Sequence, residues 1–271
     1  MPLTEQLDSL SQHLGIDLLQ DYRSYGHYVE IAGVKFAYPD IPADAGQVHY
    51  SLVDIVLSSV LRRRPERFEE IYENLAPFFH EGPYEYGPVC LKDGDVVIDC
   101  GANTGMFSAV ADCYGARVYA IEAISDTIVR YLATTASLGK HITVVNNAVW
   151  DKIKLLEFAV IENHIGSACC QELLWGGEQV SERPKVQGIT LDTFVRQMQL
   201  DRVDFIKADI EGAERNMLRG ARNTLQRFKP RLSLCSYHRP DDVGVLQDLI
   251  LAICPDYVMT QKWSKIYAYV P

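Results

Sequence analysis

Two acidic residues and two glycines in the segment from Val96 to Ala123 have the spacing of a ligand-binding site. The segment reads VVIDCGANTGMFSAVADCYGARVYAIEA. Asp99 lies near the end of an apolar run, and Gly101 and Gly105 bracket the loop that follows. Glu122 ends the next apolar run. A backbone without Cβ atoms can approach a ligand closely at a helix N-terminus, and an acid at the next strand end can accept both hydroxyls of a ribose. The segment therefore predicts a site for a ligand that contains a ribose.

The glycine pattern narrows the class of ligand. D-x-G-x-x-x-G is not the G-x-G-x-x-G loop that binds the pyrophosphate of dinucleotides. A ligand without phosphate fits better, and Asp99 can lie close to its cationic group. Glu122 follows Asp99 by 23 residues, close to the roughly 20 expected between such a loop and the ribose-binding acid. S-adenosylmethionine has a ribose, an ammonium group and a sulfonium but no phosphate, and we predict it as the cofactor.

The predicted cofactor contacts extend to segments beside this loop. Asn146 and Asn147, at the end of the third apolar run, would lie beside the adenine, although an Asx turn explains them nearly as well. Tyr84, Glu85 and Tyr86 precede the first run and could close over the cofactor or pack as an ordinary loop. The full predicted set is Tyr86, Asp99, Gly101, Ala102, Asn103, Thr104, Gly105, Phe107, Glu122, Ala123, Asn147, Ala148 and Asp209.

A second group of polar residues follows two later apolar runs. In VDFIKADIEG, Lys207, Asp209 and Glu211 lie at or just past the carboxyl end of a strand, where open α/β sheets bind ligands. His238, in LSLCSYHRPDD, would emerge at the same edge. Its ordinary pKa suits a general base near neutral pH, so we predict His238 as the base, with Asp209 or Glu211 as alternatives. Lys207 would orient those acids.

A divalent metal is an alternative use of Asp209, Glu211 and His238, because oxygen and nitrogen ligands suit such ions. Their spacing alone does not require a metal, and we predict none.

Alternating strands and helices must position these residues. The apolar runs predict strands over 96–100, 117–122, 142–147, 203–208 and 231–237, with helices over 105–114, 125–138, 212–227 and 241–253. This alternation is typical of an α/β fold with a doubly wound, Rossmann-like, mostly parallel sheet. Residues 154–161 predict an added strand, residues 166–185 a long polar loop, and residues 256–260 and 265–270 a terminal antiparallel hairpin.

The first 90 residues predict an N-terminal cap and not an independent domain. Short helices are expected within residues 1–25, a strand pair over 27–38 with Gly33 near the turn, and helices within 48–79, the second of which begins at Pro65. We therefore expect a cap over 1–90 and a cofactor-binding domain over 91–271.

Bulk properties exclude several classes of protein. The net charge of −10 over 271 residues argues against a nucleic-acid partner, because phosphate binding needs a basic face. No apolar stretch approaches the roughly 18–20 residues that span a bilayer. The N-terminus is acidic and amphipathic and does not resemble a secretory signal, so we expect a cytoplasmic protein. Seven cysteines without C-x-x-C spacing fit a reducing compartment.

Four segments in order, GDVVIDCGANTGMFS, ITLDTF, VDFIKADIEGAERNMLRGA and YHRPDD, resemble the FkbM-type methyltransferase family. The resemblance runs from about Asp93 to Asp242. It implies a class I methyltransferase fold, with a seven-stranded sheet whose last hairpin is antiparallel, and methylation of hydroxyl groups on secondary metabolites or sugars. Ala123 departs from the proline usual after the ribose-binding acid, and residues 1–90 carry no family motif.

Together these observations predict transfer of a methyl group from S-adenosylmethionine to the hydroxyl of a small natural product or sugar. N-methylation, an NAD-dependent oxidoreductase and a catalytically degenerate cofactor-binding protein stay open, as does a homo-oligomer. The acceptor would be selected by the cap and by the loop over 162–187.

Overall fold

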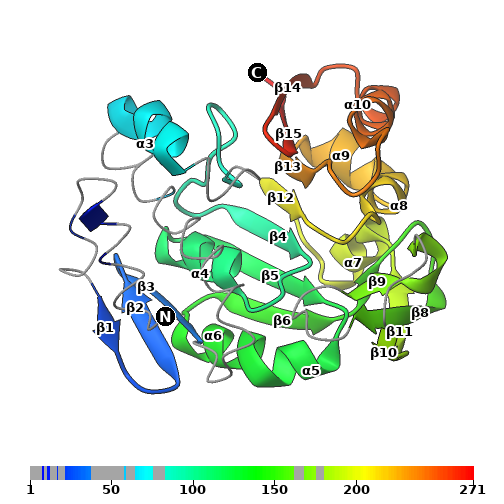
Figure 1. Cartoon of the computed structure of the whole chain (residues 1–271). Coiled ribbons are helices and arrows are strands. Elements are labelled where there is room, and N and C mark those ends of the chain that lie inside the picture. Colours follow the sequence, from blue (N-terminus) through cyan, green and yellow to red (C-terminus); the bar gives the residue numbers. More distant parts are fainter. Residues whose placement is uncertain are drawn as a thin grey trace.

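A seven-stranded sheet forms the centre of the computed structural model. The structure describes residues 22–37, 65–75, 83–161, 168–174 and 180–271 and the single positions 8, 11, 12, 17 and 58. Across the sheet the strands are β14 (Val258–Lys262), β15 (Lys265–Tyr269), β13 (Arg231–Cys235), β12 (Phe205–Ala208), β4 (Val96–Cys100), β5 (Arg117–Glu122) and β6 (Ile142–Asn146). The five strands from β13 to β6 are parallel, whereas β15 runs antiparallel to both β13 and β14 (Figure 1). The predicted doubly wound sheet with its antiparallel hairpin is confirmed.

Helices cover both faces of the sheet because successive strand residues point to opposite sides. In β4, Val97 packs with α4 (Met106–Cys113), whereas Val96 and Ile98 pack on the other face. That other face is covered by α7 (Leu191–Gln197), α8 (Glu214–Arg219), α9 (Arg222–Phe228) and α10 (Asp242–Ile253). The helical run predicted over 125–138 consists of α5 (Ser125–Thr127), a π-helical turn η3 (Ile128–Leu132) and α6 (Ala133–Leu138).

A smaller sheet lies between β6 and α7 in the chain. It contains β7 (Ala148–Val149), β8 (Lys154–Ile161), β9 (Ala168–Cys170), β10 (Val180–Glu182) and β11 (Lys185–Ile189). The predicted added strand is confirmed as β8. The predicted loop over 166–185 is wrong in part, because β9 and β10 both pair with β8 and a 3-10 turn, η4 (Gln171–Leu173), follows β9. The sequence analysis also missed β11 and α7.

The predicted helix over 212–227 is two helices rather than one. The chain breaks at Gly220, where a Cβ atom would lie 2.3 Å from the carbonyl oxygen of Trp150. Gly220 therefore packs closely against the segment after β7, a contact that the local sequence does not reveal.

The described N-terminal residues share a core with the large sheet. β1 (Arg23–Ser24), β2 (Tyr28–Ile31) and β3 (Val34–Ala37) form an antiparallel sheet, which confirms the predicted strand pair, and Gly33 has a φ of +83° in its turn. Phe36 packs in the same cluster as α4, and the Ala37 N–H donates to Thr135 Oγ1 on α6 (3.0 Å). A 3-10 turn η2 (Pro65–Arg67) opens α3 (Phe68–Leu75), as predicted. The other helices predicted within 1–25 and 48–64 lie almost entirely outside the described residues.

None of the helices in the described ranges has the length and apolar character needed to cross a lipid bilayer.

Candidate active site

A buried ion pair lies beneath the loop that follows β4. Asp99 on β4 and Lys207 on β12 are direct partners across the two parallel strands, and Lys207 Nζ lies 3.0 Å from Asp99 Oδ1. The side chains are 0% and 4% exposed. Ser108 donates to the other carboxylate oxygen (2.7 Å), and Lys207 Nζ also donates to the carbonyl of Gly101 (2.7 Å). The pair therefore fastens the loop to the sheet.

This geometry gives Lys207 a direct partner that the sequence analysis did not assign. The sequence analysis expected Lys207 to orient Asp209 and Glu211, but its ammonium group contacts Asp99 because paired residues on neighbouring strands point to the same face. Burial by itself lowers the pKa of Lys207, but the carboxylates of Asp99 and Asp209 raise it above its ordinary value, so Lys207 is charged at neutral pH. Asp99 in turn has a cationic neighbour within the chain itself.

The two loop glycines are required by close packing of the chain. Gly101 has a φ of +75°, and a Cβ atom there would lie 1.9 Å from the carbonyl oxygen of Asp209. Gly105 has a φ of +85°, and its Cβ would lie 2.7 Å from Leu132 Cδ1. Both positions combine a left-handed backbone with no room for a side chain. The sequence analysis assigned this close approach to a ligand, whereas the structure shows it toward the segment after β12 and toward η3.

Glu122, at the end of β5, is held against the same loop. Its carboxylate oxygens accept the backbone N–H groups of Asn103 (2.8 Å) and Ile124 (2.9 Å). Burial raises the pKa of Glu122, although these two N–H groups oppose the shift. Asn103 has a φ of +49°, and its Oδ1 is buried without a hydrogen-bond partner. The loop and the strand-end acid, which the sequence analysis assigned to one cofactor site, therefore lie in contact.

The other predicted cofactor residues divide into two groups. Within the loop, the Ala102 N–H donates to Ile121, and the carbonyl of Thr104 accepts from Thr135. Farther away, Asn147 donates to the carbonyl of Gln187 on β11 and Ala148 pairs with the same strand. The carbonyl of Ala123 accepts from the side chain of Asn146.

Of Tyr84 and Tyr86, which lie shortly before β4, Tyr84 reaches the acids after β12. Its hydroxyl donates to Asp209 Oδ2 (2.6 Å), and its ring packs edge-on against Phe107. The ring of Tyr86 instead packs against Trp263 and Tyr267 on and beside β15. Tyr84 was considered in the sequence analysis but not included in the predicted set.

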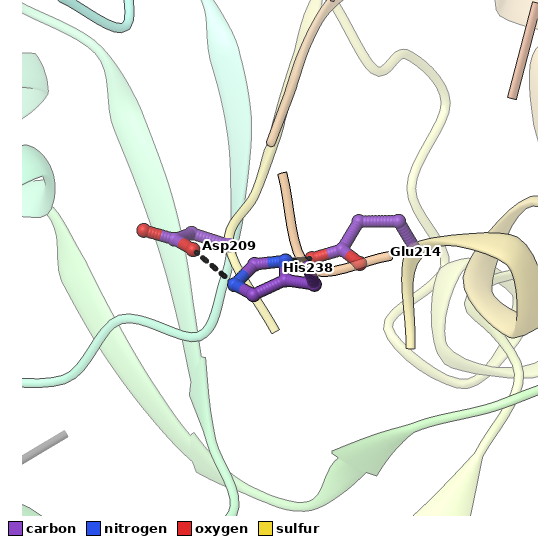
Figure 2. A group of neighbouring side chains, drawn as sticks. All are labelled: Asp209, Glu214 and His238. Atoms are coloured by element: carbon purple, nitrogen blue, oxygen red, sulfur yellow. Dashed lines mark ion pairs between the residues drawn. The ribbon is translucent and has the colours of Figure 1, made fainter. Parts of the chain in front are cut away.

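His238 lies among three carboxylates at the carboxyl ends of β12 and β13 (Figure 2). Nε2 is 3.6 Å from Asp209 Oδ1 and 3.6 Å from Glu211 Oε2, and Nδ1 is 3.3 Å from Glu214 Oε1. The structure thus brings together Asp209, Glu211 and His238, as predicted. It adds Glu214, which the sequence analysis missed although it lies directly after the turn at Gly212.

The turn after β12 has an unusual backbone. Glu211 has a φ of +53° and Gly212 a φ of +90°. A left-handed conformation at a non-glycine residue costs free energy, and such strain is concentrated at functional sites. The side chain of Glu211 is 36% exposed and that of Asp209 is 20% exposed, so Glu211 is the more accessible of these two acids.

Charges within the cluster set its protonation at neutral pH. Burial by itself lowers the pKa of His238, but the neighbouring carboxylates of Glu214, Asp209 and Glu211 raise it to about 9. Burial by itself raises the pKa of Asp209, but Lys207, His238 and the Tyr84 hydroxyl lower it to about 2. These shifts favour a protonated His238 near pH 7, unlike the neutral base that the sequence analysis expected, and an ionised Asp209.

Comparisons with solved structures give methyltransferases at low sequence identity. The FkbM methyltransferase from Methylobacillus flagellatus KT is 21% identical, with a TM-score of 0.49 over 98% of this chain and 58% of that one, so this chain spans less than two thirds of that protein. Precorrin-6y C5,15-methyltransferase from Geobacter metallireducens GS-15 is 12% identical, with a TM-score of 0.39 over 66% and 79% of the two chains. A SAM-dependent methyltransferase from Aquifex aeolicus is 14% identical, with a TM-score of 0.35 over 67% and 83%.

A search of curated protein sequences gave no match. The model of the methyltransferase FkbM domain, in contrast, matches residues 99–258, more than half of the chain. The matched range begins at Asp99 and includes Glu122 and the whole cluster around His238. The chain belongs to the FkbM methyltransferase family.

Proposed function

We propose that this protein transfers the methyl group of S-adenosylmethionine to a hydroxyl group of a small molecule, either a natural product or a sugar. The observation that carries the proposal is Glu122, an acid at the end of β5 that is fixed by backbone N–H groups beside the glycine loop, in a chain of the FkbM family.

The residues around Glu122 fit the cofactor. Each of its oxygens accepts one backbone N–H, and because a carboxylate oxygen has capacity for a second donor, both can still accept a ribose hydroxyl. The buried Oδ1 of Asn103 has no hydrogen-bond partner in the chain and offers a further acceptor. The backbone from Gly101 to Gly105 and the side chain of Glu122 would therefore hold the cofactor, which when bound supplies an electrophilic methyl group.

The cluster after β12 and β13 would position the acceptor. Alignment of the reacting atoms supplies roughly 7–11 kcal/mol of a barrier of this kind. Glu211, with its accessible carboxylate, is the candidate to accept the hydroxyl proton. His238 lies 3.6 Å from both Asp209 and Glu211 and would hold them in place, while Tyr84 holds the other oxygen of Asp209. Asp99 and Lys207 act indirectly, by fixing the loop.

We further propose that the cap over 1–90 and the segment over 162–187 select the acceptor, and that the protein acts in the cytoplasm. Comparing turnover on hydroxyl and amine acceptors separates O-methylation from N-methylation, and cell fractionation tests the location. A protein that binds the cofactor tightly but turns over no acceptor would instead be a degenerate member of the family.

Calorimetry with S-adenosylhomocysteine tests the cofactor site. We expect Glu122→Ala to weaken binding by about 10- to 100-fold, since a hydrogen bond to a charged group contributes about 1.5–3 kcal/mol. Glu182→Ala on β10 removes an exposed acid and should leave the affinity unchanged. Binding of NAD in place of S-adenosylhomocysteine, or full affinity in Glu122→Ala, would contradict the proposal.

A further inference from the structure

The geometry around His238 has features of an ion-binding site. The imidazole lies between Asp209 and Glu214 (Figure 2), and one ligand atom from each of the three residues lies within 4.8 Å of the other two. The His238 side chain is 9% exposed and that of Glu214 is 0% exposed. Three side chains that can ligate a metal therefore converge in a largely buried place.

Several polar atoms of this cluster lack hydrogen bonds. Neither ring nitrogen of His238 makes one, and neither does Glu214 Oε2. A buried polar atom without a hydrogen-bond partner costs about 1–3 kcal/mol, so native structures seldom keep several together without a reason.

The separations leave three ligands close enough to be drawn onto one ion. With metal–ligand distances of ~2.1 Å, two ligands lie ~3.0 Å apart at right angles and ~3.4 Å apart at a tetrahedral angle. Only one ring nitrogen of His238 can bind a given ion, because Nδ1 and Nε2 point away from the ring in different directions. Nδ1 lies 3.3 Å from Glu214 Oε1, and one ligand atom of Asp209 lies within 4.8 Å of one from each of the other two residues, so a shift of the Asp209 carboxylate would complete the site.

We propose that Asp209, Glu214 and His238 bind a divalent cation. One imidazole nitrogen and two carboxylate oxygens form a mixed donor set, which suits a first-row ion such as Mn²⁺ better than the all-oxygen sites typical of Ca²⁺. Glu211, 3.6 Å from His238 Nε2 and partly exposed, lies on the accessible side of the cluster.

The role of the cation in catalysis rests on the proposed methyltransferase function, whereas the binding of the cation to the three side chains does not. A cation at the carboxyl ends of β12 and β13 would bind the acceptor hydroxyl and lower its pKa, so that the oxygen becomes a better nucleophile. The competing arrangement is a proton on His238 held by the same carboxylates, because a proton and a metal ion compete for an imidazole nitrogen.

Titration of the full chain with Mn²⁺, followed by the electron paramagnetic resonance signal of the free ion, tests the site. We expect one ion per chain to bind to the wild-type protein. His238→Asn and Glu214→Gln should each raise the dissociation constant for Mn²⁺ at least about tenfold. Substituting a residue that only supports a metal ligand already lowers metal affinity about 10- to 100-fold. Glu172→Gln is the control: it makes the same change of charge in an exposed acid paired with Lys154, and should bind as the wild type does.

Circular dichroism establishes that each variant is folded, and Asp209→Asn replaces any variant that is not. A wild-type chain that binds no Mn²⁺ at millimolar concentration, or folded variants that bind it undiminished, would overturn the cation site in favour of the protonated histidine. Calorimetry with S-adenosylhomocysteine on the same samples separates the two proposals. Cofactor binding without Mn²⁺ binding overturns the cation site alone, and Mn²⁺ binding without cofactor binding overturns the methyltransferase function alone.

Discussion

Removing one charge of the buried pair between Asp99 and Lys207 should destabilise the protein strongly. At the observed 3.0 Å and an effective dielectric constant of ~20, the Coulomb attraction is about 5 kcal/mol. Lys207→Met leaves the carboxylate of Asp99 charged with no exposed surface, and breaking a buried pair in this way costs about 3–5 kcal/mol. Because whole domains are stable by about 5–15 kcal/mol, this loss is a large share of the total.

A double-mutant cycle isolates the pair itself. Asp99→Asn leaves the ammonium group of Lys207 without its partner and should cost a similar free energy of unfolding. The double variant removes both charges, so its cost should fall short of the sum of the single costs by at least about 3 kcal/mol.

Urea unfolding followed by circular dichroism measures these free energies. The control is Lys229→Met, which breaks a pair with Asp256 at 2.6 Å whose side chains are 40% and 59% exposed, and which should cost at most about 1 kcal/mol. Equal losses in Lys207→Met and Lys229→Met, or strictly additive costs in the cycle, would refute the electrostatic reasoning.

Three further substitutions test other parts of the structure. Gly101→Ala should prevent folding or lower the melting temperature far more than Gly94→Ala. Both glycines have a φ of +75°, but only a Cβ atom at position 101 would lie against a backbone oxygen, that of Asp209. Equal thermal shifts in the two variants would show that the backbone angle alone matters. Thr190→Ala removes the side-chain oxygen that accepts a backbone N–H at the start of α7. It should lower the free energy of unfolding, measured in urea, by about 1 kcal/mol, whereas Thr190→Ser keeps the oxygen and should lose little. Tyr84→Phe removes the hydroxyl that donates to Asp209 Oδ2. It should lower the turnover number but leave the affinity for S-adenosylhomocysteine within about twofold of the wild-type value. A large loss of that affinity would place Tyr84 in the cofactor site instead.

The central sheet could be predicted from the sequence because its signals are local. Each parallel strand is a short apolar run, and polar residues such as Glu122 and Asp209 mark where the runs end. The spacing predicted Glu122 as the ribose-binding acid, which stays a prediction; in the structure Glu122 accepts the N–H of Asn103 in the glycine loop. In contrast, β9 and β10 have three residues each and exist by pairing with β8, so their own residues gave little indication.

The composition of the site could be predicted only in part, because several contacts depend on the register of distant strands. Lys207 pairs with Asp99 through the alignment of β12 with β4, which sequence spacing does not reveal. Tyr84 reaches Asp209 from 125 residues away. The protonation of His238 follows from the combined burial and charge of its neighbours, and a single histidine in a sequence carries no information on either.

The order of strands in the sheet bears on how the chain is made. β15 is synthesised after β14, yet it lies between β14 and β13 (Figure 1). Until β15 leaves the ribosome, the outer edge of β13 has no partner, and β14 has no strand of the sheet on which to pair. An exposed strand edge is a template for aggregation, and nascent chains meet this hazard while they are incomplete. The nascent protein should therefore depend on chaperones most in the interval between the appearance of β13 and that of β15.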